Sequence, residues 1–205
     1  MSTQQSGYLP LSAEARRLYQ VLLRTVADDG PELSSGAFPD ISDTRGGGNL
    51  SDFGALVDAG LIAHDVETGL VTAVLPLVAR EPATVVYLDD DDQLPRLTVG
   101  VVDGFALAVL LDRRVRIIDR CPTCGELVSI MAGPDGIRGR DPRSAVAVRI
   151  PADGPRLSSA DTIRLTCSPE HGQAALEQSG NPDAVLQSIE GLAIEARERY
   201  AVVLP

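Results

Sequence analysis

The chain has 205 residues, of which 44% are hydrophobic, so it can bury a sizeable core in one large or two small domains. Its formal net charge is −11, which repels phosphate backbones, and we expect no binding to nucleic acid. No apolar stretch approaches the roughly 20 residues of a membrane span and no secretory signal opens the chain, so we expect a cytoplasmic protein that does not bind membranes.

The first 80 residues have the pattern of a small helical region followed by a hairpin. Apolar residues recur at helical spacing over 12–28, with Ser12 as the predicted N-cap. A Gly- and Asp-rich loop then leads to a second helix that ends at Gly60. Two apolar runs over 61–78, joined by the turn letters VETG, predict a β-hairpin. This order predicts a winged-helix-like region over 1–80, with His64 as an ordinary surface histidine.

Residues 81–205 predict a second domain, of mixed α/β structure. The acidic run Asp89–Asp92 lies between two predicted strands, and we interpret it as a solvated hairpin tip. The apolar segment 101–112 predicts a buried helix that is interrupted only by Asp103 and Gly104. The remaining elements that we expect are strands over 115–119, 127–133 and 144–151, a turn over 133–142, a strand leading to Cys167, a helix from Ser168 and a helix–strand–helix segment over 181–204.

All three cysteines and one of the two histidines fall into a metal-ligand pattern. Cys121 and Cys124 are separated by two residues on a predicted turn, and Cys167 and His171 are separated by three residues at a helix start. Both spacings let the two donors face a common centre. Three thiolates and one imidazole form a closed tetrahedral set, which is typical of structural zinc sites. The sequence therefore predicts one structural Zn²⁺ held by Cys121, Cys124, Cys167 and His171.

The thiols allow two other interpretations. A thioredoxin-type redox pair needs the first cysteine to open a helix, but the letters GELVSI after Cys124 favour a strand. Buried thiols with no common partner are the second alternative. Ligand spacing favours the metal over both.

The order of these segments resembles the alkylmercury lyase (organomercurial lyase) family. The likeness lies in LTVGVVDGFALAVLLDRRVRIIDRCPTCGELVSI, LTCSPEHGQAAL and IEGLAIEARERYAV, and is best over about 97–200. The resemblance implies an α+β fold in which a winged-helix-like region (1–80) precedes an alkylmercury-lyase-like mixed sheet with flanking helices (81–205). All 18 basic residues are arginine, a bias that suggests a high-GC bacterial source.

In the family, two thiolates bind mercury, and an aspartate helps to deliver the proton that cleaves the carbon–mercury bond. The resemblance places the aspartate on Asp103, the second thiolate on Cys167 and the first thiolate on Gly100, which has no thiol. It also places a family cysteine on Cys121 and the family histidine on His171, whereas Cys124 is an added thiol.

The departure at Gly100 predicts a diverged relative that is not a competent lyase. Its pocket around Gly100, Asp103 and Phe105 would serve another small molecule, with Asp103 as the proton donor or acceptor. An equal alternative is that Asp103 only caps or hydrogen-bonds its helix. Two further hypotheses stay open: a true lyase in which Cys121, Cys124 and Cys167 bind mercury beside Asp103, and a non-enzymatic winged-helix regulatory or protein-binding module.

Overall fold

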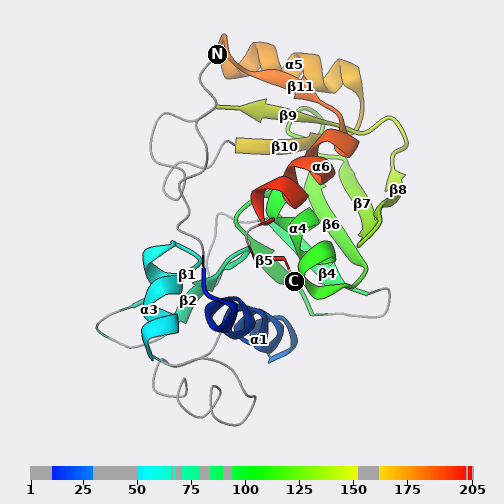
Figure 1. The fold of residues 1–205 in the computed structure, drawn as a ribbon. Coiled ribbons are helices and arrows are strands. Elements are labelled where there is room, and N and C mark those ends of the chain that lie inside the picture. Colours follow the sequence, from blue (N-terminus) through cyan, green and yellow to red (C-terminus); the bar gives the residue numbers. More distant parts are fainter. Residues whose placement is uncertain are drawn as a thin grey trace. The chain divides into compact units, whose positions relative to one another are not determined.

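The computed structural model describes residues 11–29, 50–65, 67, 71–78, 84–89, 94–151, 162–201 and 203–204 (Figure 1). The chain divides into two compact units, one within Met1–Leu75 and Arg199–Pro205 and one within Pro76–Glu198. The division into a winged-helix-like region (1–80) and an alkylmercury-lyase-like domain (81–205) stays a prediction.

The first unit contains the two predicted helices, α1 (Ala13–Asp29) and α3 (Leu50–Asp58). The Ser12 hydroxyl accepts a hydrogen bond from the Ala15 amide at 2.9 Å, so the predicted N-cap of α1 is confirmed. Gly60 follows α3 with φ of 68° and donates to the Val57 carbonyl, which is the left-handed helix end that only glycine adopts freely. Leu18, Leu22 and other buried side chains of α1 form one stripe of the core of this unit.

The hairpin of this unit is shorter than the sequence predicts. Strands β1 (Ile62–His64) and β2 (Val71–Val74) pair antiparallel, as expected. The second apolar run does not continue as one strand, because Leu75 and Pro76 form a turn before β3 (Leu77–Val78). Proline lacks the N–H that a continuous ladder needs. Most of the predicted VETG turn lies outside the described residues, and a winged-helix arrangement stays a prediction.

The second unit is built on a sheet with the strand order β3-β5-β4-β6-β7-β8. Its strands after β3 are β4 (Thr84–Leu88), β5 (Arg96–Thr98), β6 (Val115–Arg120), β7 (Leu127–Gly133) and β8 (Gly136–Asp141). The pairs β3·β5, β4·β5, β4·β6, β6·β7 and β7·β8 are antiparallel. The expected mixed sheet is therefore wrong for these pairs. Short connections between consecutive strands explain the antiparallel pairs β4·β5, β6·β7 and β7·β8.

Helix α4 (Val101–Leu111) covers one face of this sheet and is apolar on almost all sides. Ten of its residues are buried, Asp103 among them, so the predicted buried helix is confirmed. It contacts β4, β5, β6 and β7 within the same unit. Gly104 permits this close approach, since a Cβ there would lie 3.1 Å from the Ile117 side chain.

A second, smaller sheet has the order β10-β9-β11, made of β9 (Val146–Ile150), β10 (Thr162–Thr166) and β11 (Val185–Gln187). Its pairs are antiparallel, and α5 (Pro169–Ser179) packs on all three strands. The chain then forms α6 (Ile189–Arg199). The predicted helix–strand–helix segment over 181–204 is wrong, because a strand and one helix follow α5.

Two further expectations need correction. The segment 133–142 is not only a turn, since the register Ile130↔Arg140 makes its second half the strand β8. Strand pairing thus overrides the high glycine content of GIRGRD. Asp89 is not merely solvated, because it forms an ion pair with Arg113 at 2.6 Å; Asp90–Asp92 lie outside the described residues.

No helix in the described part of the chain is long and apolar enough to cross a membrane.

Candidate metal centre

The first half of the centre is the turn that joins β6 to β7. The Cys121 amide donates to the Glu126 carbonyl and the Gly125 amide donates to the Cys121 carbonyl, both at 2.8 Å. Gly125 has φ of 77°, a conformation that favours glycine. This tight knuckle directs the thiols of Cys121 and Cys124 to the same side. Cys121 is buried and Cys124 is exposed.

The second half lies where β10 ends and α5 begins. Ser168 caps α5 by accepting from the His171 amide at 3.3 Å, and Pro169 occupies the first turn, as the sequence predicts. Cys167 precedes the cap and His171 is in the first turn, so both side chains emerge at the helix start. The Ser144 hydroxyl donates to the Cys167 carbonyl at 2.7 Å and fixes the strand end.

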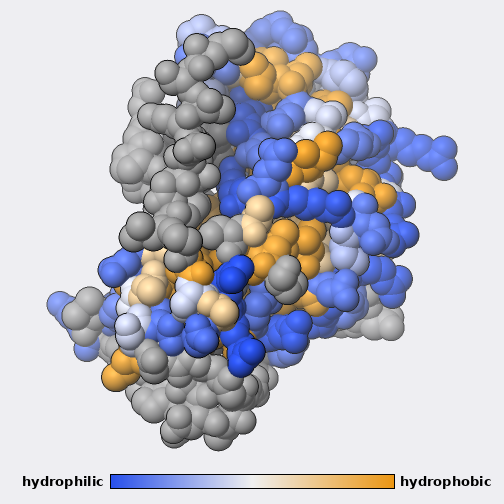
Figure 2. Space-filling view, viewed as in Figure 1, coloured by the Kyte–Doolittle hydropathy of each residue, from blue (hydrophilic) through white to orange (hydrophobic). Residues whose placement is uncertain are grey.

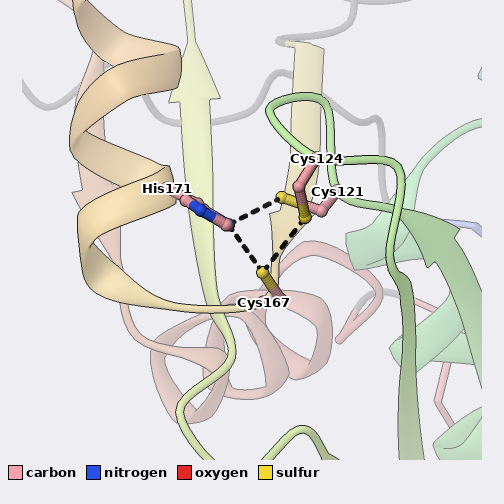
Figure 3. Close-up of side chains that lie close together, drawn as sticks. All are labelled: Cys121, Cys124, Cys167 and His171. Carbon is pink, nitrogen blue, oxygen red and sulfur yellow. Dashed lines mark hydrogen bonds between the residues drawn. The ribbon is translucent and has the colours of Figure 1, made fainter.

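The two halves meet in one cluster, drawn in Figure 3. The four donor atoms of Cys121, Cys124, Cys167 and His171 all lie within 4.8 Å of one another. The sulfurs of Cys124 and Cys167 are 3.6 Å apart, and His171 Nδ1 lies 2.8 Å from the Cys167 sulfur and 3.8 Å from the Cys121 sulfur. The sequence therefore named all four members of the cluster correctly.

Two polar contacts hold the halves together beside the thiols. Asp119, on β6, accepts two hydrogen bonds at 3.1 Å from the Arg164 guanidinium and one at 3.1 Å from the Leu165 amide, both on β10. The Thr123 hydroxyl, within the knuckle, donates to the His171 carbonyl at 2.9 Å. The Thr123 hydrogen bond therefore positions the knuckle against the start of α5.

Sequence reasoning missed these supporting residues. Thr123 lies between the cysteines, where the Cys-x-x-Cys spacing requires no particular residue, and Asp119 resembles any charged residue at a strand end. Their partners lie more than 40 residues away, so no local pattern could reveal them.

The thiols of the cluster differ in acidity. Burial alone raises the pKa of Cys121, but backbone hydrogen bonds from Cys167, Cys124 and Thr123 outweigh it and lower the pKa to about 6. Burial, followed by the neighbouring Cys124, Glu126 and Cys121, raises the pKa of Cys167 well above its ordinary value.

Gly172 lets α5 approach the small sheet directly behind His171. A Cβ at Gly172 would lie 2.6 Å from the Leu186 side chain and 3.2 Å from both Thr166 Oγ1 and Val146 Cγ2. These distances are shorter than ordinary van der Waals contacts, so this position in α5 requires the smallest residue.

The structure places the other predicted site residues on or beside α4. Asp103 is 4% exposed and Phe105 is 2% exposed. Gly100 is the N-cap position of α4, and a Cβ there would lie 3.6 Å from Asp103 Oδ2, so Gly100 adjoins the carboxylate. Asp103 does not belong to the four-residue cluster. A ligand pocket at these residues stays a prediction.

His64 lies in the first unit, where its ring meets that of Phe53 at a centroid distance of 6.0 Å. It is half-buried and lies outside the Cys/His cluster of the described residues; its interpretation as an ordinary surface histidine stays a prediction.

Comparison with known proteins finds matches among solved structures. No family model and no curated protein matches the sequence. Among solved structures, the crystal structure of the mercury-bound form of MerB2 superposes with a TM-score of 0.64 at 17% sequence identity. The match covers 94% of this chain and 100% of that chain. At this identity the likeness establishes the fold, and the chain therefore has a MerB-like α+β fold.

Proposed function

We propose that Cys121, Cys124, Cys167 and His171 hold one structural Zn²⁺ that locks the β6–β7 knuckle to the start of α5. The observation that carries this proposal is the convergence of four soft or borderline donors from two segments 43 residues apart. A set of three cysteines and one histidine leaves no open position on tetrahedral zinc, which is typical of structural sites.

The distances support this ion. With Zn–S bonds of about 2.3 Å, tetrahedral geometry separates two sulfurs by roughly 3.8 Å and a sulfur from a nitrogen by roughly 3.6 Å. The Cys124–Cys167 distance of 3.6 Å and the Cys121–His171 distance of 3.8 Å agree with this geometry. The Cys167–His171 distance of 2.8 Å has to lengthen by roughly 0.8 Å to reach this geometry. A cation also stabilises the thiolates, including that of Cys167, whose pKa is otherwise raised.

We further propose that the MerB-like scaffold no longer cleaves carbon–mercury bonds. That cleavage transfers a proton to the carbon while mercury stays on sulfur. The family's first thiol is replaced here by Gly100, and Cys167, the family's second thiol, is engaged in the Cys/His cluster. Asp103 is buried beside Gly100 and so offers a carboxyl group next to the space left by the missing thiol. A small molecule that exchanges a proton with Asp103 would occupy this position, with Phe105 as an apolar wall.

Metal analysis of protein purified without chelator tests the zinc. We expect about one zinc per chain, and loss of that zinc in Cys121→Ser together with a lower melting temperature, because metal binding is coupled to folding. A stable protein that contains no metal would contradict the proposal.

Mercury capture is the second candidate, favoured by the three clustered sulfurs and by the mercury-bound state of the MerB2 structure. The deciding assay incubates the zinc-loaded protein with phenylmercury and excess thiol and measures released benzene. We expect no release above the uncatalysed background, in the wild type or in Gly100→Cys. Turnover that Asp103→Asn abolishes would instead establish lyase activity.

A further inference from the structure

A groove separate from the metal centre lies between the edge strand β8 and helix α6. It has a volume of about 450 Å³ and is lined by residues of the β7–β8 turn, β8 and α6: Asp135, Gly136, Ile137, Arg138, Gly139, Arg140, Glu190, Ala193, Ile194 and Arg197. Three arginines and two carboxylates line it; Arg138 pairs with Asp135 and Arg140 pairs with Glu190, so the lining carries one positive charge in excess on a chain of net charge −11. In Figure 2, hydrophilic and hydrophobic patches alternate over this part of the surface.

The strand that forms one wall offers free backbone groups. Within the described residues, β8 is the last strand of its sheet and pairs with β7 on one side only. The outer side of such a strand carries unpaired N–H and C=O groups, which can accept a further extended segment. A groove between an edge strand and a helix is a geometry in which peptides bind by strand addition.

A β-bulge directs two side chains of β8 toward the helix. Arg140 lies opposite Ile130, and Ile137 lies opposite Ala132, with the register shift between Met131 and Ala132. Ile130 and Ala132 are both buried on the same face of β7, so Arg140 and Ile137 face that side too. Arg140 reaches Glu190 on α6 at 3.3 Å, which confirms this direction.

The groove combines positive charge with exposed aliphatic surface. The side chain of Arg138 is 54% exposed, and its partner Asp135 is 77% exposed, so that ion pair is solvated and exchangeable. Ile194, in the middle of α6, is 59% exposed. Arg197 donates to the Pro134 carbonyl and so positions the second wall against the turn.

We propose that this groove binds an extended acidic peptide of a partner protein, which adds to β8. Its carboxylates would meet Arg138 and Arg140 in exchange for Asp135 and Glu190, and the methylene stems of its acidic side chains would cover Ile137 and Ile194. A second copy of the chain is a poorer occupant, because pairing β8 with itself would bring arginines of the two copies together. The excess positive charge of the groove therefore favours an acidic strand as its occupant.

The test uses the full-length protein and a fluorescein-labelled Glu-Val-Glu-Val-Glu-Val peptide, followed by fluorescence polarisation at low ionic strength. We expect saturable binding that weakens as salt is added. Arg138→Glu should weaken it roughly tenfold, whereas Arg143→Glu, a matched reversal at an exposed arginine outside the groove lining, should change it less than about twofold. Circular dichroism checks that both variants remain folded.

Several outcomes would overturn the proposal. One is that the Glu-Val peptide shows no saturable binding up to about 1 mM. Another is that Arg138→Glu and Arg143→Glu weaken its binding equally. A third is that a Lys-Val peptide binds as tightly as the Glu-Val peptide. Equal binding of the same peptide with methylated backbone nitrogens would exclude strand addition. Displacement by millimolar free glutamate would point to a small-anion site, and a wild-type dimer that Arg138→Glu dissociates would make a second copy the occupant.

Discussion

The Sγ atom of Cys167 lies 2.8 Å from Nδ1 of His171, and the Sγ atom of Cys124, from a hairpin 43 residues earlier, lies 3.6 Å from the same sulfur. Cys167 therefore joins a local pair, set by the start of α5, to a long-range pair, set by the packing of the knuckle. The start of α5 sets the contact between Cys167 and His171, whereas the contact between Cys124 and Cys167 depends on the tertiary packing of the knuckle. Separate variants can therefore test the two contacts.

Replacement of the histidine ligand should remove the metal. His171→Gln keeps a polar side chain but loses the imidazole donor, so we expect zinc affinity to fall by more than roughly 100-fold, the upper range for changes just outside a ligand set. His64→Gln is the matched control, because His64 lies in the first unit and outside the cluster. The measurement is zinc content after dialysis against a competing chelator. Equal zinc in the two variants would show that His171 is not a ligand.

Metal removal should loosen the protein locally. Addition of a strong chelator, or acidification that protonates the thiols, should release zinc, because cysteine binds metal as the thiolate. Hydrogen exchange should then accelerate over 119–126 and 166–173, where the knuckle meets α5 and β10. The amides of α1 belong to the other unit and should keep their exchange rates. Uniform acceleration across the chain would mean that the ion supports the whole fold, and no change would contradict the structural zinc.

The sequence predicted the four members of the Cys/His cluster because each of the two pairs follows a short, local spacing. It predicted α5 for the same reason, since Ser168 and Pro169 are local signals of a helix start. The sequence did not predict the features that depend on contacts between residues far apart in the chain. The segment GIRGRD becomes β8 only because β7 pairs with it, and no local pattern distinguishes it from a turn. The arginine groove was missed likewise, because Arg138 and Arg197 meet only after α6 packs beside β8.

The contact between Asp119 and β10 should stabilise the fold independently of the metal. Asp119→Asn weakens a bidentate interaction with Arg164 and an acceptor for the Leu165 amide, and its side chain is only 17% exposed. We expect a loss of about 1–3 kcal/mol in the free energy of unfolding. Asp135→Asn, at a solvated ion pair with Arg138, should change it by less than about 0.5 kcal/mol. Urea unfolding of zinc-loaded protein measures both, and equal losses would show that Asp119 has no special role.

The same substitution should have opposite effects at two helical glycines. At Gly54, in α3, no atom lies within 4 Å of an added Cβ, so Gly54→Ala should raise the free energy of unfolding by about 0.5–1 kcal/mol through helix propensity. At Gly172 the added methyl meets Leu186, Thr166 and Val146, so Gly172→Ala should lower it by about 1–3 kcal/mol.

A double variant identifies the cause of that loss. Leu186 provides the shortest contact, at 2.6 Å, and is partly exposed, so its removal in Gly172→Ala/Leu186→Ala should recover part of the stability relative to the sum of the single variants. The remainder reflects the 3.2 Å contacts with Thr166 and Val146, which belong to β10 and β9 and cannot move freely. Additive losses in the double variant would show that Leu186 already rotates away in Gly172→Ala. Stabilisation by Gly172→Ala alone would show that α5 does not need the close approach that places His171 beside Cys167.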